Sequence, residues 1–418
     1  MQPLDELFQM LQECLSPPET PHSPRCVPDD LDALLSLATQ QRVLEIIIGN
    51  ILSLPAEIRQ RSQKLSQLHL TYTKQIAGNI MRQDAGLMVI HRLRQALGVP
   101  VILLKGPVLS LCYPNPDSRT ARDLDIFVDK AHMEKALAFF RAEGFSLSDE
   151  PVSHHYLCTR QDTGLIELHT DLFGEASKNK LFGPHASKDL LAMDTLPFAY
   201  GAYQMETLNP TGNLSFIIMH AAKHFIFGRP YLRQLLDILM FARAYGGDVN
   251  WPLLWEMLDD ANLSAWASCV FVLGRQRLDL PYPTGKPFSA QDGQLIDSLL
   301  AHLLKSRVWD EQGLNTQMHR HLIRDEDTSR IRHIERSKWH YYIRLLCPPV
   351  HSLEPARYGY AHRFRMLLPV AWVHRLCHWL LGNRGGLSQA LREGEIIHEA
   401  LTEEMKLLRQ FKLMRDDE

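Results

Sequence analysis

Hydrophobic positions at helical spacing dominate the first hundred residues of the chain. Residues 4–15 place apolar side chains at three- and four-residue intervals, which is typical of an amphipathic helix. The same spacing predicts a pair of helices over residues 31–52 and one long helix over residues 56–97. Proline-rich residues 17–28 separate the first helix from the others. These helices are expected either to bury one side of a sheet or to shape a binding site beside it.

The pattern changes at residue 101. Val101–Leu104 is a short apolar run between a proline and a glycine, which predicts a buried strand. Gly106 permits a tight turn, and Pro107 suits the first position of a helix, predicted over residues 107–113. Residues 119–128 then alternate in polarity and predict a second strand.

Three carboxylates fall on the strands predicted around this turn. Because side chains alternate along a strand, Asp123 and Asp125 share a face and repel each other. A later strand, residues 163–169, carries Glu167 and His169 on one face. Carboxylate oxygens are the ligands that divalent cations such as Mg²⁺ prefer. The pattern therefore predicts a cup for one or two Mg²⁺ ions, with Mn²⁺ as the alternative, which suits phosphoryl or nucleotidyl transfer.

Between these strands and beyond them the pattern is mixed. A helix is predicted over residues 132–143 and short strands over residues 145–147 and 154–159. His154 and His155 begin the last of these strands, and adjacent strand residues point in opposite directions, so we expect only one of them to face the cup. From about Pro197 onward the chain is predicted to be helical.

Two histidines and an aspartate stand out in this later part. His220 and His224 are one helical turn apart, but the glutamate that zinc proteases place after the first histidine is absent. Asp237 lies in a strongly apolar helix and therefore needs a partner, for which His220, Lys223 and His224 are candidates. The group would either lock two helices together or form a polar wall over a nucleotide.

Further helices are predicted over residues 251–278, 290–306, 330–346, 367–381 and 387–413. The helix at 330–346 mixes cationic and aromatic side chains. This composition suits either an amphipathic helix on the protein surface or a helix that binds a polyanion. The helix at 367–381 would either dock on the protein or lie on a membrane surface.

The predicted fold class is α+β. A small mixed β-sheet core, residues 99–195, lies between an N-terminal helical region, residues 1–98, and a C-terminal helical region, residues 196–418.

Composition narrows the function classes. The chain has 418 residues, of which 45% are hydrophobic and 22% charged, and a net charge of −3. This charge gives no support for a dedicated nucleic-acid-binding protein, although local basic patches would allow such a contact. Seven scattered cysteines indicate a reducing compartment, and we expect a cytoplasmic protein without a signal peptide or a transmembrane segment.

The motifs resemble those of a known group of enzymes. The order L-L-K-G, then R-x-x-R-D-L-D-I-F-V, then I-E-L-H is similar to the nucleotidyltransferase superfamily that includes DNA polymerase β. More narrowly, it resembles a poorly characterised bacterial nucleotidyltransferase family with the pattern LKG…R…D-x-D…E-L-H. The superfamily usually has Gly-Ser at the turn, where this chain has Gly106-Pro107, so we expect Lys105 to take the place of the serine.

This resemblance implies transfer of a nucleoside monophosphate from an NTP, such as ATP, to an acceptor. Asp123, Asp125 and Glu167 would be the catalytic and metal-binding residues, with Glu167 either a ligand or a base. The remaining predicted site residues would bind the nucleotide: Lys105, Gly106, Arg119, Arg122, His169 and Lys223.

The acceptor is open among protein, peptide, RNA, sugar and other small molecules. A related Lys-Gly turn in toxin nucleotidyltransferases suggests modification of tRNA as an alternative function. A scaffold that binds nucleotide without turnover is a further alternative.

Overall fold

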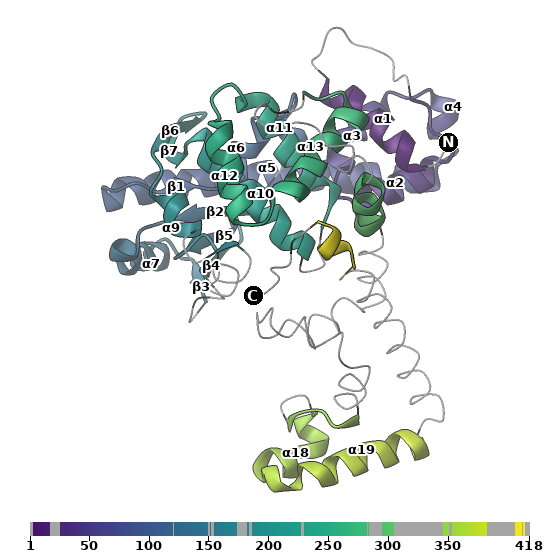
Figure 1. The fold of residues 1–418 in the computed structure, drawn as a ribbon, viewed down its shortest axis with the longest axis vertical. Helices are drawn as coiled ribbons and strands as arrows, with labels where there is room; N and C mark the ends of the chain where they lie inside the picture. Colours follow the sequence, from purple (N-terminus) through teal and green to yellow (C-terminus); the bar gives the residue numbers. More distant parts are fainter. Residues whose placement is uncertain are drawn as a thin grey trace. The chain divides into compact units, whose positions relative to one another are not determined.

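The computed structural model describes residues 3–16, 26–119, 121–148, 151, 154–173, 182–183, 186–226, 230–281, 283, 295–304, 346–350, 353–382, 406–411 and 413. The chain forms two compact units. Unit 1 comprises Met1–Arg307 and Phe411–Glu418, and unit 2 comprises Val308–Gln410. Unit 1 contains the sheet and most of the helices labelled in Figure 1. The three regions predicted from the sequence stay a prediction.

Short helices open unit 1: α1 (Pro3–Leu15), α2 (Leu31–Gln40), α3 (Leu44–Leu52) and α4 (Ala56–Arg59). The first three agree with the sequence prediction. The apolar stripe of α1 is buried except for the half-buried Leu4, and α1 packs against α2, α3 and α13. At the start of α2, the Asp30 side chain accepts a hydrogen bond from the Ala33 amide, which satisfies one free N–H of the first turn.

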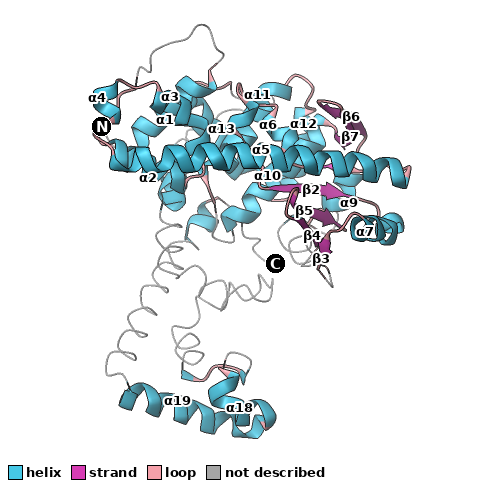
Figure 2. Ribbon diagram, turned by 180° about the vertical axis from the view of Figure 1, so that it is seen from behind, coloured by secondary structure: helices cyan, strands magenta, loops and turns pink. Residues whose placement is uncertain are grey.

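The helix predicted over residues 56–97 is divided in two. The main part, α5 (Gln63–Leu97), has 35 residues and begins at Ser62, whose hydroxyl accepts a hydrogen bond from the Leu65 amide. The helix breaks because Ser62 takes an extended conformation as its N-cap. Helix α5 crosses the near side of unit 1 in Figure 2 and contacts β5 and β7.

Seven strands form one mixed sheet in the order β3-β4-β5-β2-β1-β7-β6. The predicted strands are observed as β1 (Ile102–Leu103), β2 (Asp123–Phe127), β3 (Ser146–Leu147), β4 (His155–Arg160) and β5 (Gly164–His169). Strand β2 runs parallel to β5 and antiparallel to β1. The sheet with its flanking helices confirms the α+β fold class.

One hairpin differs from the sequence prediction. The chain after Pro197 was predicted to be helical, but it forms β6 (Thr195–Tyr200) and β7 (Tyr203–Leu208), joined by a turn in which Gly201 has φ +57°. Pro197 is tolerated because β6 is the edge strand of the sheet. Strand β7 adds in parallel to β1 and so extends the sheet beyond the predicted core.

The connections around β2 are short helical turns. Helix α6 (Pro107–Ser110) has 4 residues and is shorter than the predicted 107–113 helix. The chain continues through η1 (Pro116–Ser118), and after β2 through η2 (Lys130–His132) and α7 (Met133–Ala142).

Helices complete unit 1: α9 (Ala186–Leu191), α10 (Pro210–Ile226), α11 (Leu232–Tyr245), α12 (Trp251–Asp260) and α13 (Ser264–Leu278), followed by helical residues 295–304. Figure 1 shows α10 and α12 on the near side of unit 1, and Figure 2, turned by 180°, shows α5 on its near side. Unit 1 therefore has a layer of helices on each side of its sheet.

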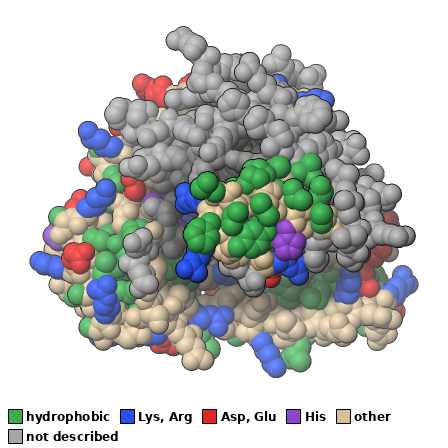
Figure 3. Space-filling model, turned by 90° about the horizontal axis from the view of Figure 1, so that it is seen from below, with side chains coloured by type: hydrophobic (Ala, Val, Ile, Leu, Met, Phe, Trp, Pro, Cys, Tyr) green, Lys and Arg blue, Asp and Glu red, His purple; other side chains and the backbone are tan. Residues whose placement is uncertain are grey.

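Unit 2 has a small core of its own. It comprises α18 (Pro355–Arg363), η6 (Arg365–Leu367) and α19 (Leu368–Gly382), which pack around Leu353 and Ala371. Hydrophobic side chains also gather on an outer face of this unit (Figure 3). The exposed members on these elements are Phe364, Met366, Leu367, Val370, Val373 and Leu376.

Other predicted C-terminal elements are only partly covered. The predicted 330–346 helix lies outside the described residues except for residue 346, and of the predicted 387–413 helix only residues 406–410 are described as helical. Within the described part of the chain, none of the helices combines the length and the apolar character needed to cross a bilayer.

Candidate active site

The sheet register brings the predicted carboxylates together. Strands β2 and β5 pair in parallel with Asp125 opposite Glu167, so both side chains and Asp123 lie on one face of the sheet. The opposite face carries Leu124, which packs against α5. Asp125 has a side chain only 1% exposed, whereas Glu167 is 19% exposed. The carboxylates thus form a cup that is closed at Asp125 and more open at Glu167.

Lys105 compensates the buried charge of Asp125. It follows β1, where the Leu104 amide donates to the Asp125 carbonyl, and its Nζ lies 2.9 Å from Asp125 Oδ1. Burial lowers the pKa of Lys105, but the Asp125, Asp123 and Glu167 carboxylates raise it above its ordinary value. Lys105 is therefore an ammonium ion at neutral pH.

The remaining oxygen of Asp125 has no such neighbour. Among the described residues, Asp125 Oδ2 is buried and has no hydrogen-bond partner. One ligand atom each from Asp125, Glu167 and His169 lies within 4.8 Å of the others. An unpaired buried carboxylate oxygen is costly unless a cation or a donor satisfies it. The donor set therefore fits a divalent cation with oxygen ligands.

The pKa values of Asp123 and Asp125 are shifted in opposite directions. Burial and the neighbouring Asp125 raise the pKa of Asp123. Burial also raises the pKa of Asp125, but Lys105 and His169 outweigh this effect and hold it well below its usual range. Of the two carboxylates, Asp123 is therefore the one that takes up a proton first as pH falls.

His169 sits between the carboxylates and the backbone. Its Nε2 is 3.1 Å from Asp125 Oδ1 and 3.7 Å from Glu167 Oε2, and its Nδ1 is 3.3 Å from the Asp171 carbonyl oxygen. Burial lowers the pKa of His169, but the hydrogen bonds with Asp125 and Glu167 raise it above its ordinary value. Acceptors at both ring nitrogens favour the doubly protonated imidazolium.

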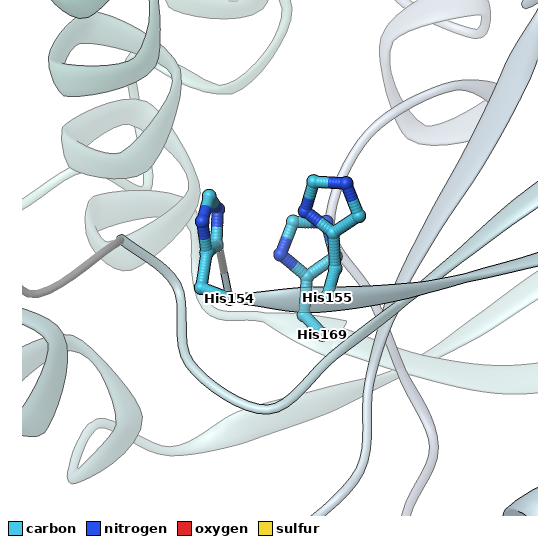
Figure 4. A group of neighbouring side chains, drawn as sticks. All are labelled: His154, His155 and His169. Carbon is cyan, nitrogen blue, oxygen red and sulfur yellow. The ribbon is translucent and has the colours of Figure 1, made fainter. Parts of the chain in front are cut away.

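Two more histidines flank His169, contrary to the expectation that only one of them would face the cup. The ring centroids of His154 and His155 lie 5.2 and 5.1 Å from that of His169, and Figure 4 shows the three rings rising from one side of the strands. The alternation rule fails because β4 begins at His155, and His154 belongs to the preceding turn. Burial, with help from Lys223, lowers the pKa of His154 to about 2.

Helix α10 adds His220 to the site. His220 Nε2 is 3.3 Å from Lys105 Nζ, and His224 Nε2 is 3.1 Å from His220 Nε2. Burial and the Lys105 charge lower the pKa of His220 well below its ordinary value, so the neutral His220 ring can accept a hydrogen bond from the ammonium group. The predicted spacing of one helical turn was the only sequence signal for this arrangement, and it gave no indication of Lys105 as the neighbour.

Arg119 is paired with a buried carboxylate on α11. Its guanidinium makes two hydrogen bonds to Asp237, of 2.9 and 2.7 Å, and Tyr113 donates a third to the same carboxylate at 2.8 Å. The proposed partners of Asp237 on α10 were therefore wrong, and Arg119 and Tyr113 take that role. The pair is buried on both sides and joins the segment before β2 to α11.

The turn after β1 depends on a glycine. Gly106 has φ +74°, and a Cβ there would come within 3.3 Å of the Ala121 Cβ, so only glycine fits easily.

Two predicted nucleotide ligands lie outside this turn. Arg122 is exposed, and no ion pair links it to another described residue. Arg122 and the half-buried Lys223 stay predictions as nucleotide ligands.

Comparison with known proteins gives a single match. A family model described as an uncharacterised nucleotidyltransferase covers residues 28–279, which is more than half of the 418 residues. No curated protein and no solved structure matches the chain. The match spans the whole cup, from the helices before β1 to α13.

Proposed function

The chain belongs to this uncharacterised nucleotidyltransferase family, and we propose that it moves a nucleoside monophosphate from an NTP to an acceptor nucleophile. In this reaction the acceptor forms a bond to the α-phosphorus and the bond between the α-phosphorus and the α,β-bridging oxygen breaks. Pyrophosphate leaves with the electron pair of that bond, and the acceptor proton passes to a base or to water. The proposal also draws on the resemblance of the active-site motifs to those of the superfamily of DNA polymerase β.

The single observation that supports this proposal best is the buried Asp125 with one unpartnered oxygen, beside Glu167. Asp123, Asp125 and Glu167 would hold Mg²⁺, or alternatively Mn²⁺. When bound, the cation would supply positive charge for the triphosphate oxygens. The carboxylates of this chain provide the negative charge and the oxygen ligands that such a cation requires.

Lys105 has a second task in this proposal. In the structure its charge compensates Asp125, at 2.9 Å. A cation at the carboxylates would take over that compensation, so the ammonium group would become available to the triphosphate. A hydrogen bond to a charged group contributes about 1.5–3 kcal/mol, which is the scale of the contact that Lys105 would make with phosphate.

Other residues orient the substrate or prepare the site. Exposed Arg122 and half-buried Lys223 are proposed to contact the triphosphate, and the Gly106 turn lets the backbone come close. His169 fixes the Asp125 carboxylate. Arg119 is held by Asp237, so in this arrangement it would position the segment before β2. It could contact the nucleotide directly only after separating from Asp237.

Glu167 has two candidate roles, ligand and base. Its greater exposure places it where an acceptor could reach, which would suit a base, while the need for a third negative charge favours a ligand. Glu167→Gln separates the roles. If Glu167 is a ligand, the loss of transfer rate in the variant should shrink when the metal concentration is raised. If Glu167 is a base, the loss should be independent of metal concentration and should change with pH.

The direct test is pyrophosphate release by the full chain with each NTP and Mg²⁺, in the presence of a cell extract as the source of acceptor. Asp125→Asn and Asp123→Asn should each abolish release, because each removes a charged oxygen while keeping the size of the side chain. Asp162→Asn is the matched control, since Asp162 is exposed on the turn between β4 and β5. Full activity in both cup variants would overturn the assignment.

The same incubation identifies the acceptor. With an NTP labelled in its α-phosphate, the labelled species is a protein, a peptide, an RNA such as tRNA, or a small molecule. Label in tRNA alone would favour the toxin-type alternative. Tight NTP binding without any pyrophosphate release would favour the inactive scaffold.

A further inference from the structure

Three imidazoles converge at one end of the sheet, beside the carboxylate cup. One ring nitrogen each from His154, His155 and His169 lies within 4.8 Å of the others. The ring centroids of His154 and His155 are 4.9 Å apart. Figure 4 shows that all three rings stand on the same side of the strands. The nitrogens are thus close enough for one ion to contact all of them after small side-chain rotations.

Strand pairing fixes the backbone of this cluster. His155 and His169 lie opposite each other across the antiparallel pair β4–β5, which puts their side chains on one face. The carbonyl oxygen of His154 accepts hydrogen bonds from both the amide and the hydroxyl of Thr170, each 2.9 Å long. These bonds hold the turn at His154 against the end of β5, so the imidazoles are held in place by the fold.

The cluster also contains an unsatisfied nitrogen. Among the described residues, His155 Nδ1 is buried and has no hydrogen-bond partner. Its Nε2 lies 3.8 Å from Glu167 Oε2, beyond the length of a hydrogen bond. A half-buried imidazole with one buried, unpartnered nitrogen and a second nitrogen beyond hydrogen-bond distance adds little to stability but is a suitable ligand.

We propose that His154, His155 and His169 bind a transition-metal cation of the Zn²⁺ type. Neutral imidazole is a preferred ligand of Zn²⁺ and Co²⁺, whereas Mg²⁺ prefers oxygen. Binding of the ion would release to water the proton that His169 carries on its ligating nitrogen in the metal-free protein. Three protein ligands leave one position of a tetrahedral ion for water or another group. The Glu167 carboxylate lies beside the cluster and is a fourth ligand of suitable charge. This site rests on its nitrogen donors and does not depend on nucleotidyl transfer.

The two cation sites would share side chains. His169 belongs to the imidazole cluster and also contacts Asp125 of the cup, and Glu167 is near both. An ion held by the imidazoles would draw His169 away from Asp125. The chain would thereby distinguish two classes of cation by donor type at adjacent positions.

The test is titration of the full, metal-free chain with Co²⁺, in which binding is measured by the visible absorption of the bound ion. Wild type should bind one tightly held ion with the spectrum of a nitrogen-coordinated, four- or five-coordinate site. His154→Ala and His155→Ala should each weaken Co²⁺ affinity by at least roughly 10- to 100-fold. His132→Ala is the control, because His132 is half-buried and lies outside the cluster, and its side chain has no hydrogen bond or ion pair with another described residue. Circular dichroism establishes that each variant is folded.

X-ray absorption of the Zn²⁺-loaded wild type tests the proposal without any substitution. Scattering from several imidazoles is the expected result. Coordination dominated by sulfur or by oxygen alone would overturn the proposal, as would Co²⁺ affinity that is unchanged in both histidine variants. The proposal would also be overturned if wild type bound no Co²⁺ ion more tightly than the variants that lack His154 or His155.

Discussion

Asp125 carries a negative charge inside unit 1, where two neighbouring side chains compensate it. Lys105 and His169 approach the same oxygen, Oδ1, at 2.9 and 3.1 Å. The second oxygen, Oδ2, is buried and has no hydrogen-bond partner among the described residues. The carboxylate therefore keeps its charge despite burial, and it keeps one oxygen available for a cation.

The first prediction concerns Lys105. Lys105→Met keeps most of the side-chain volume and removes the charge. If the ammonium group moves to the triphosphate, NTP binding with Mg²⁺ should weaken by about 1.5–3 kcal/mol, roughly 10- to 150-fold in Kd. Calorimetric titration measures this change, and Lys135→Met, at an exposed position of α7, serves as control. An unchanged Kd would confine Lys105 to its pairing with Asp125.

The second prediction concerns the pH dependence of stability. The pKa of His169 is raised in the folded protein, so its stabilising effect is complete below the unfolded pKa of about 6.5 and is lost as pH rises through the folded pKa. His169→Gln should therefore lower the free energy of unfolding more at pH 6 than at pH 9. Urea denaturation in metal-free buffer at both values measures this. A loss that is equal at both values, or larger at pH 9, would show that the His169 proton contributes nothing.

At the scale of elements, the position of the cup depends on how closely α5 lies over β2. Gly86 faces Leu124, and a Cβ at Gly86 would come within 2.5 Å of Leu124 Cδ1. Leu124 stands between the two aspartates in sequence and points to the other face of the sheet. The contact between α5 and β2 thus sets the backbone that carries the carboxylates.

The third prediction compares two glycines of α5. Gly86→Ala should destabilise unit 1 by about 1–3 kcal/mol, because the added methyl group overpacks a buried contact. Gly78→Ala, on the same helix, should instead stabilise by about 0.5–1 kcal/mol, since its Cβ would meet only the flexible Arg82 guanidinium. Urea denaturation of both variants measures the difference. Equal effects of the two substitutions would show that α5 is not tightly packed at Gly86.

The elements that carry the cup could be predicted from sequence because they depend on local pattern. The alternation over 119–128 placed Asp123 and Asp125 on one face, and β2 has that register. The β6–β7 hairpin was missed because Pro197 disfavours an interior strand, and its position at the sheet edge follows only from the pairing of β7 with β1.

The contacts that complete the site could not be predicted in the same way. Arg119 and Asp237 are 118 positions apart, and no local pattern relates them. His154 escaped the alternation rule because the first residue of β4 could not be fixed from sequence to within one position. Strand starts decide the direction of a side chain, so an error of one residue reverses the expected face.

At the scale of the whole molecule, the cup is assembled from distant parts of unit 1. His220 of α10 approaches Lys105, and Asp237 of α11 binds Arg119 and Tyr113 beside the β2 segment. These contacts cross the boundary predicted at residue 196. The helices after the sheet therefore contribute to the position of the residues around the cup.

The fourth prediction tests the strongest of these long-range contacts. Asp237→Ala leaves the Arg119 guanidinium buried without its partner, which should destabilise unit 1 by about 3–5 kcal/mol. The double variant Arg119→Met with Asp237→Leu should lose clearly less stability than the sum of its single variants, because apolar side chains can replace a buried ion pair. Urea denaturation of Arg119→Met, Asp237→Leu and the double variant, together with wild type, completes this double-mutant cycle. Asp162→Ala removes the exposed partner of Arg160 and should change stability by less than about 1 kcal/mol. Strict additivity in the cycle would show that Arg119 and Asp237 do not hold the sheet and α11 together.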